Sequence, residues 1–189
     1  ARATPDGSGS GKLVSGDGKL LQRAAKLLDS EYSSIVPVHY RQPLAPYAAA
    51  WKEGAVPLAQ IEKVYQKAVR QYERLIVEGI GGVLVPITKT FSAIDWPVKW
   101  KLPTLVVARA GLGTINHTLL TLEALKRRKV KVVGLLVNGD RGKTPAEKTN
   151  LKVLRNLAGV PVWGPLKFNP KYRTQLDFLA NDLKKLGLG

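Results

Sequence analysis

The sequence has 189 residues, no Cys and no Met, and its 30 Lys and Arg residues outnumber 14 Asp and Glu, which gives a net charge of +16 at pH 7. The lack of Cys excludes disulfides, thiolate metal sites and a cysteine nucleophile. His39 and His117 lie far apart, with no zinc-ligand spacing around either. The apolar runs are too short for a bilayer span and no signal peptide is visible, so we expect a soluble protein with no membrane partner.

The length suits one compact domain, and we expect residues 1–189 to form a single domain. Because the sequence does not begin with Met, we also expect that the start of the gene product is missing from it. The positive charge favours polyanions such as nucleotides, nucleic acid or acidic surfaces. Its densest cluster, at residues 126–131, falls where a helix should end, and cations there complement the helix dipole. A solvated helix terminus is therefore the favoured interpretation of that cluster.

Along the chain, residues 1–16 contain a Gly/Ser-rich stretch and predict a flexible loop. Apolar residues then recur at helical spacing between 20 and 28, and a Pro-punctuated stretch leads to a long helix predicted over 58–74.

Short β-branched runs follow and alternate with amphipathic helical segments. The strands are expected at 75–77, 104–107, 130–137 and 160–162, and the helices near 114–128, 145–158 and 172–186. This alternation predicts an α/β fold with a mostly parallel sheet flanked by helices in three layers. In such sheets ligands bind in the loops that follow the carboxyl ends of the strands.

The first of these loops contains Glu78 and three glycines within the next four positions. Glycine permits close backbone approach, and a carboxylate at a strand end is a hard oxygen ligand that suits Mg²⁺ beside nucleotide phosphates. A Gly-rich turn with an exposed Glu is the alternative.

The second loop, residues 110–117, reads Ala-Gly-Leu-Gly-Thr-Ile-Asn-His and precedes a predicted helix. Thr114 is expected as the N-cap, and the amides of the following turn would form a cradle for phosphate or carboxylate. A capped helix after a tight turn is the simpler alternative. His117 is expected to pack or hydrogen-bond rather than to act as a general base.

The third loop contains Gly142-Lys143-Thr144, which imitates the end of a P-loop. The first glycine that the GxxxxGK[ST] pattern requires would fall at Val137, so the pattern fails here and elsewhere in residues 1–189. Asn138, at the end of the preceding strand, has an amide that could read a base edge.

These loops, taken in order, resemble those of one enzyme family, dethiobiotin synthase. Residues 78–88 are similar to its VEGxGG…P motif, residues 93–96 to its A-D-W segment, and residues 106–121 to its most recognisable stretch. Residues 134–138 resemble the strand that ends in an adenine-contacting Asn, and residues 162–166 a late G-x-[IL]-P element. The likeness runs from about residue 13 to 169.

The resemblance implies a P-loop NTPase-like fold, a cytoplasmic homodimer (an organellar location being the alternative), and a ligase of biotin biosynthesis that uses ATP and Mg²⁺. Its substrates would be 7,8-diaminopelargonate and CO₂, which it joins and closes into a cyclic ureido ring. The implied metal ligands are Asp17 and Glu78, and Asp17 would also contact ATP. The implied nucleotide contacts are Asn138, Pro165 and Leu166, and the implied substrate contacts are Gly79, Gly82, Leu112, Gly113, Ile115 and Asn116.

The sequence also departs from the family's pattern. The family's first strand, its P-loop and its catalytic Lys would precede position 1, so no catalytic residue is identified and we expect no useful synthase activity from residues 1–189 alone. Lys171 stands about where the family often carries a nucleotide-contacting Glu. The alternative is a non-catalytic, strongly basic relative that acts as a structural or RNA-binding component of a larger assembly.

Overall fold

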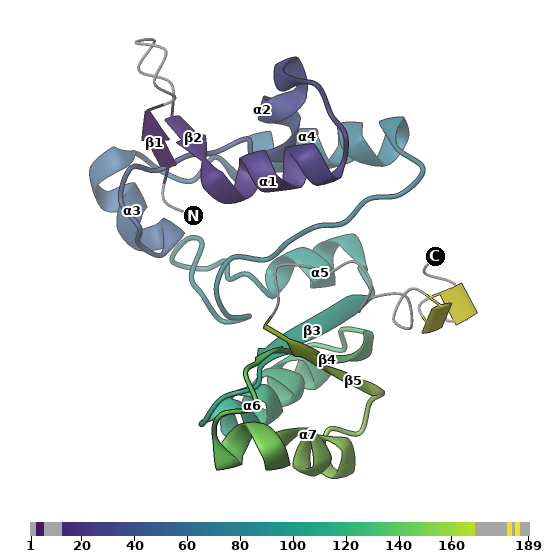
Figure 1. Cartoon of the computed structure of the whole chain (residues 1–189). Coiled ribbons are helices and arrows are strands. Elements are labelled where there is room, and N and C mark those ends of the chain that lie inside the picture. The colour runs from purple at the N-terminus through teal and green to yellow at the C-terminus, as the bar shows by residue number, and fades with distance from the viewer. Residues whose placement is uncertain (1–2, 6–12, 169–180, 183, 186–189) are drawn as a thin grey trace. The chain divides into compact units, whose positions relative to one another are not determined.

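The computed structural model describes residues 3–5, 13–168, 181–182 and 184–185. The chain separates into two compact units, Ala1–Ala93 and Ile94–Gly189, which are described in turn below (Figure 1). Among the described residues, no helix combines the length and the apolar character that crossing a membrane requires.

The first unit begins with a short antiparallel ladder between β1 (Ala3–Pro5) and β2 (Leu13–Ser15). The expected loop over residues 1–16 thus contains two paired strands, and its Gly/Ser stretch lies outside the described residues. The Ser15 hydroxyl accepts from the Gly18 amide at 3.2 Å and caps the helix α1 (Gly16–Ala24). This helix carries Asp17 in its first turn and Arg23 in its last, which suits the helix dipole.

Up to residue 71, the rest of the first unit consists of helices joined by loops. It contains the 3₁₀ turn η1 (Asp29–Glu31) and the helices α2 (Tyr32–Ile35), α3 (Pro46–Glu53) and α4 (Leu58–Gln71). Tyr32 is buried, stacks on His39 and accepts a 2.7 Å hydrogen bond from the Ser15 amide. The helix predicted over 58–74 is confirmed as α4, which ends three residues earlier, at Gln71.

Residues 75–77 were expected to form a strand, and the structure corrects this, because they form neither a helix nor a strand. Their side chains are exposed, with Ile76 at 93%. A β-branched run becomes a strand only when a neighbouring strand pairs with its backbone. None of the described residues pairs with this segment.

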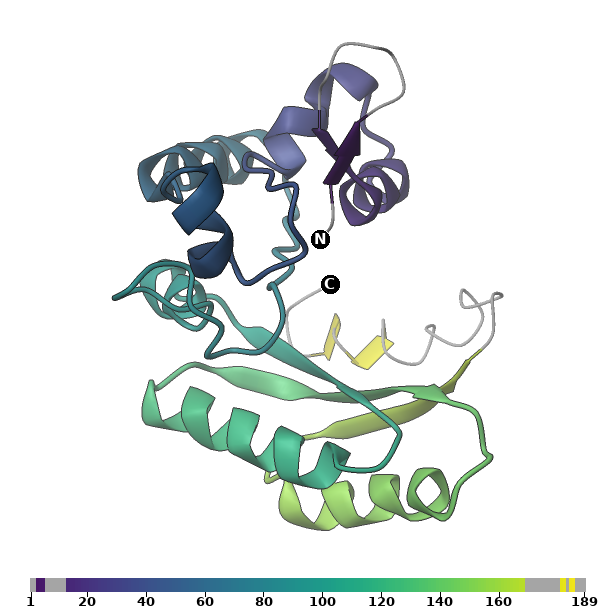
Figure 2. The ribbon, with the colours of Figure 1, turned by 90° about the vertical axis from the view of Figure 1, so that its left-hand side faces the viewer.

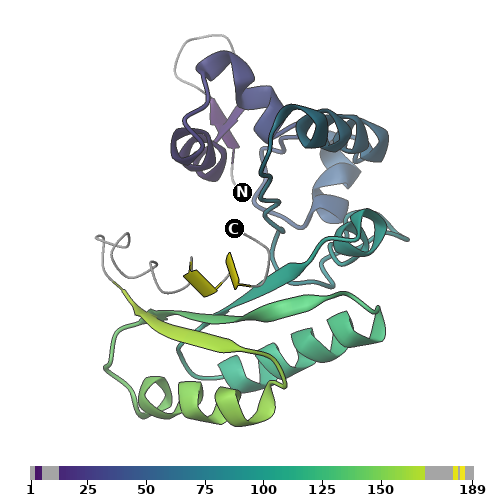
Figure 3. The ribbon, with the colours of Figure 1, turned by 90° about the vertical axis from the view of Figure 1, so that its right-hand side faces the viewer.

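The second unit is an α/β layer structure, as the sequence predicts. Its strands β3 (Thr104–Arg109), β4 (Val132–Asp140) and β5 (Val162–Lys167) form a parallel sheet in the order β3-β4-β5. The helices α6 (Thr114–Arg127) and α7 (Pro145–Leu157) connect them and lie together on one face of the sheet (Figures 2 and 3). The predicted helices 114–128 and 145–158 are thus confirmed, and most of the one expected near 172–186 lies outside the described residues.

The core of this unit is built from both faces of β4. Leu135 and Val137 are almost fully buried, as are Leu125 of α6 and Leu154 of α7. Leu136 packs with Leu166, Leu105 and Trp163 in a second cluster. The Trp163 indole N–H donates to Asp182 at 2.9 Å. Burial on both faces is what a continuous apolar run in a parallel strand predicts.

The short helix α5 (Asp95–Trp100) is tied to the end of α6 by an ion pair between Asp95 and Arg128 at 2.5 Å. Arg127 pairs with Glu123 one turn earlier at 2.6 Å. The basic cluster at 126–131 therefore surrounds the end of a helix, as predicted, with Lys126 and Lys129 exposed.

Candidate functional site

The carboxyl edge of the three-stranded sheet gathers three segments from separate parts of the sequence. Since β3, β4 and β5 are parallel, the segments that follow them all begin at this edge. These are the loop at 110–113, the loop at 141–144 and, after β5, Phe168.

The loop at 110–113 joins β3 to α6 and is held at several points. The Ala110 amide donates to the Asn138 carbonyl at 2.9 Å and so continues the sheet by one bond. The side-chain amide of Asn150, on α7, donates to the carbonyls of Ala110 at 2.8 Å and Gly111 at 3.1 Å. The Arg109 guanidinium donates to the Leu112 carbonyl at 2.9 Å. Side chains from two elements therefore fix the backbone of this loop.

The N-cap of α6 is Gly113 rather than the expected Thr114. Gly113 has φ of 86°, in the left-handed region where glycine is favoured, and Thr114 is the first helical residue. The Thr114 side chain is 2% exposed and its hydroxyl lies 3.5 Å from that of Thr118, so it faces the interior instead of capping the helix.

The first turn of α6 carries the residues expected to bind substrate. Ile115 and Asn116 lie at positions whose backbone N–H groups have no acceptor one turn earlier in the helix, so these groups are directed out of its N-terminus. Leu112 is 83% exposed just before this turn, and His117 is also exposed. The sequence-predicted anion cradle thus corresponds to a helix N-terminus at the carboxyl edge of the sheet.

Strand pairing brings together the three residues that the family resemblance assigns to the base of the nucleotide. Asn138 lies on β4 opposite Leu166 of β5, and Pro165 precedes Leu166. Asn138 and Pro165 are half-buried, whereas Leu166 is 5% exposed and packs on Leu136. Asn138 also lies opposite Arg109 of β3, so this group borders the loop at 110–113.

The segment Gly142-Lys143-Thr144 is closed by a carboxylate of the chain itself. Glu147 accepts from the amides of Thr144, Lys143 and Arg141 at 2.9, 3.0 and 3.2 Å, and from the Thr144 hydroxyl at 3.0 Å. The bond from the Thr144 amide is the largest of the effects that hold the pKa of Glu147 below its usual value. Thr144 caps α7 in return, in a capping box. These amides hold a side chain rather than face a phosphate.

Asp17 and Glu78 are both in the first unit. Asp17 is exposed in the first turn of α1. Glu78 follows the exposed residues 75–77, which pair with none of the residues that the structure describes, rather than a strand end. An added Cβ at Gly79 or Gly82 would meet no atom within 4 Å, so both glycines have open space around them. Within the described ranges, no three His, Cys, Asp or Glu residues gather closely enough to hold a metal ion.

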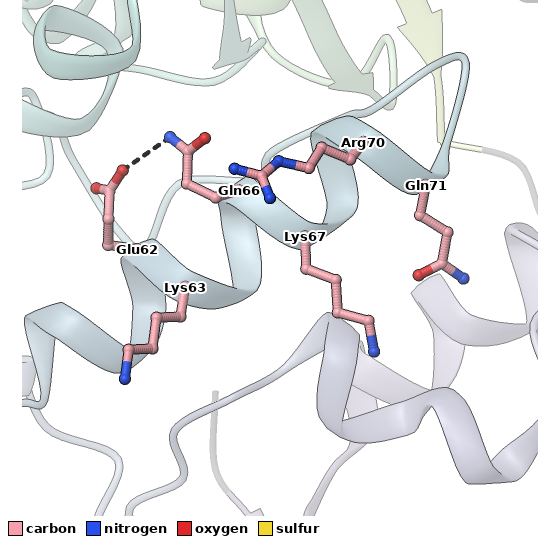
Figure 4. Close-up of a pocket in the computed structure, with 6 residues that line it drawn as sticks. All are labelled: Glu62, Lys63, Gln66, Lys67, Arg70 and Gln71. Carbon is pink, nitrogen blue, oxygen red and sulfur yellow. Dashed lines mark hydrogen bonds between the residues drawn. The ribbon is translucent and has the colours of Figure 1, made fainter.

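A shallow hollow runs along the exposed face of α4, and none of its lining residues is a site residue expected from the sequence (Figure 4). Its lining residues are Glu62, Lys63, Gln66, Lys67, Arg70 and Gln71. All six belong to one helix, and the Gln66 amide donates to Glu62 at 3.0 Å. Lys171, the position expected to contact nucleotide, lies outside the described residues.

Three residues that position these loops were not identified from the sequence: Arg109, Asn150 and Glu147. A signal exists for two of them. Glu147 is the last residue of the pattern Thr-x-x-Glu, three positions after Thr144, that begins a helix. Asn150 lies four residues before Leu154, on the buried face of α7, where a polar side chain needs a hydrogen-bond partner.

The sequence of the chain is similar to those of known proteins. A family model described as an AAA domain matches residues 7–175. The chain is 41% identical over 145 residues to the ATP-dependent dethiobiotin synthetase BioD of Aquifex aeolicus, an alignment that covers 76% of this chain and 64% of that protein. It is 39% identical over 168 residues to the protein of the same name from Thermodesulfovibrio yellowstonii (84% and 70%), and 35% identical over 181 residues to that from Bacillus licheniformis (92% and 76%). The chain belongs to the dethiobiotin synthetase family.

Proposed function

We propose that this chain carries the substrate-binding and base-binding part of an ATP-dependent dethiobiotin synthetase in biotin biosynthesis. In this reaction CO₂ forms a carbamate with one amine of 7,8-diaminopelargonate, ATP phosphorylates the carbamate, and the second amine displaces phosphate to close the ureido ring. The observation that carries the proposal is the loop at 110–113, whose fixed backbone leads into α6 beside Asn138.

For the nucleotide, we assign the base to the group formed by Asn138, Pro165 and Leu166. An Asn side chain offers both a donor and an acceptor, which suits the edge of adenine. Pro165 is half-buried next to it on the neighbouring strand and offers apolar surface, whereas Leu166 is buried against Leu136 and would support this group from within the core. The half-buried position of Asn138 fits a side chain that meets a ligand rather than bulk water.

For the metal, we assign Mg²⁺ to Asp17 and Glu78. Mg²⁺ keeps several waters and binds one or two carboxylates together with substrate phosphates, so a cluster of three protein ligands is not needed. Both side chains are exposed. When bound, the metal would neutralise charge on the phosphates that react.

For the substrate, we assign the carboxylate of 7,8-diaminopelargonate to Leu112, Gly113, Ile115 and Asn116, across the interface of a homodimer. A helix N-terminus favours a negative group through its N–H groups and its dipole. Gly79 and Gly82 would approach the substrate with their backbone, because open space surrounds both.

For the phosphates, we assign the grip to a GxxxxGK[ST] loop, a pattern that does not occur in residues 1–189. Two proteins test the proposal: residues 1–189 alone, and the same residues preceded by a segment that carries a GxxxxGK[ST] loop of the kind that the family resemblance implies. The first should form no dethiobiotin from ATP, CO₂ and 7,8-diaminopelargonate, and the second should form it.

Substitutions in the active fusion test the roles within it. Glu78→Gln should lower kcat and raise the Mg²⁺ concentration needed for half-maximal rate, whereas Glu73→Gln, at another exposed position five residues earlier, should change neither. A folded fusion that binds neither ATP nor 7,8-diaminopelargonate would overturn the proposed function. Turnover by residues 1–189 alone would overturn the requirement for an added phosphate loop.

A further inference from the structure

Three consecutive carbonyls between β3 and α6 are each held by a side chain. Those of Ala110 and Gly111 accept from Asn150, and that of Leu112 accepts from Arg109. Because a peptide group is planar, fixing the direction of a carbonyl also fixes the direction of the N–H group that follows it. The amides of Gly111, Leu112 and Gly113 are therefore oriented by these two side chains.

Asn150 is the more constrained of the two. It is 6% exposed and reaches the loop from α7, 40 positions later in the sequence. An Asn amide nitrogen has two protons, and both have carbonyl acceptors here, at 2.8 and 3.1 Å. An Asp of the same shape would face these carbonyls with an acceptor, so the side-chain NH₂ group is the feature that the site requires.

The loop held by Asn150 also contacts the strand proposed to read the base, because the Ala110 amide donates to the Asn138 carbonyl. Ala110 is 2% exposed. Its N–H donates to β4 and its C=O accepts from α7, so both of its backbone polar groups are held. A shift of α7 against the sheet would move the backbone that precedes Gly113.

We infer that Asn150 is a positioning residue for substrate binding: it fixes the peptide orientation of the loop at 110–113, so that the N-terminus of α6 receives the carboxylate of the diamino acid. This inference rests on the proposed function and extends it to a residue that lies behind the loop. Asn150 touches the loop backbone and acts through it.

The test compares three substitutions on α7 in residues 1–189. Asn150→Asp keeps the shape and removes the donors. Asn156→Asp makes the same change at an exposed position of the same helix. Leu154→Ala removes a fully buried side chain one turn from Asn150, and so lowers stability without touching the loop. Binding of 7,8-diaminopelargonate is measured by calorimetry, and the amide resonances of residues 111–116 are followed by NMR.

Asn150→Asp should weaken binding of 7,8-diaminopelargonate at least about tenfold, since two hydrogen bonds are lost and a carbonyl repulsion is added. The amide resonances of Gly111 and Gly113 should shift. Asn156→Asp and Leu154→Ala should leave the affinity within about twofold as long as the protein remains folded.

Equal affinity of the wild type and Asn150→Asp would overturn the role of Asn150 and leave the proposed function standing. An equal loss of affinity in Leu154→Ala would also overturn it, because general destabilisation would then explain the effect. A wild-type chain that is folded yet does not bind 7,8-diaminopelargonate would overturn the proposed function, and the positioning role with it.

Discussion

Gly134 lies in the central strand of the sheet, directly beneath the ring of Trp163. A Cβ added there would overlap Cζ3 of that ring and would lie 3.0 Å from the Pro161 carbonyl oxygen. The ring is itself held in place, since its N–H donates to Asp182. A glycine in the middle of a strand usually weakens it, and here it permits the close approach of an indole.

Gly134→Ala should therefore lower the free energy of unfolding of the second unit by about 1–3 kcal/mol, through overpacking. Urea unfolding followed by tryptophan fluorescence measures this. Gly111→Ala, at a glycine of the same unit with no atom near its added Cβ, should have a smaller effect. In the double variant Gly134→Ala/Trp163→Leu, the smaller Leu side chain should reduce the destabilisation that Gly134→Ala causes. If the changes in unfolding free energy of the two single variants simply added up in the double variant, the contact would be contradicted.

Residue-level roles were only partly predictable from the sequence. A Thr at the start of a helix is a good N-cap candidate, but Thr114 is turned inward to Thr118, and Gly113 takes the cap position instead. Sequence spacing gives the position of a side chain along the helix and not the direction of its hydroxyl. Asn150 shows the same limit, because its partners lie 39 and 40 positions away.

At the scale of elements, α7 begins in a capping box whose acid also closes the preceding loop. The carboxylate of Glu147 accepts from three backbone amides, and the bond from the Thr144 amide is the first cause of its lowered pKa. A carboxyl whose pKa is lower in the folded than in the unfolded state stabilises the fold above the unfolded value, near 4.5. This contribution is lost as the pH falls through the folded value.

The Tm of the second unit should thus decrease as the pH is lowered below about 4.5, and Glu147→Gln should lower the Tm at pH 7 and flatten this decrease. Thermal unfolding between pH 3 and pH 7 measures both effects. Glu123→Gln, which removes a surface ion pair with Arg127, serves as the comparison and should change the profile less. Parallel profiles for the wild type and Glu147→Gln would show that the capping carboxylate does not contribute.

Elements with strong local signals were predicted correctly. The strand expected at residues 75–77 was not, because no described strand pairs with it. The helices α4, α6 and α7 follow from apolar spacing, and β4 from a continuous apolar run. Residues 75–77 carry the same β-branched pattern, yet Ile76 is 93% exposed. Helical hydrogen bonds are local to a segment, whereas those of a strand depend on a neighbour that the segment does not itself encode.

At the scale of the whole molecule, the order of the loops was more informative than any single motif. The Gly-rich segment at 78–82, the loop at 110–113 and Asn138 each admit a simpler interpretation. Two of the three meet at one edge of the second unit, where the Ala110 amide donates to the Asn138 carbonyl. Two of the relatives align with 84% and 92% of the chain, which is far more than any one of these motifs covers. Charge was less informative, since two cations of the densest basic cluster form ion pairs at the end of α6.

The homodimer proposed above places Leu112 at the interface. Leu112 is 83% exposed in the single chain, and its side chain is large and apolar, so burying it against a second copy would remove apolar surface from water. Leu112→Asp should therefore shift residues 1–189 from dimer to monomer in sedimentation velocity, and should weaken binding of 7,8-diaminopelargonate. Its Tm, measured where both proteins are monomeric, should stay close to that of the wild type, because the exposed Leu112 side chain contributes little to the fold of the single chain.

Leu157→Asp is the control. It changes a leucine that is 57% exposed at the last residue of α7, and it should leave the dimer intact. If Leu112→Asp remained dimeric and bound substrate with unchanged affinity, the loop would serve neither the interface nor the carboxylate, and both assignments would fall together.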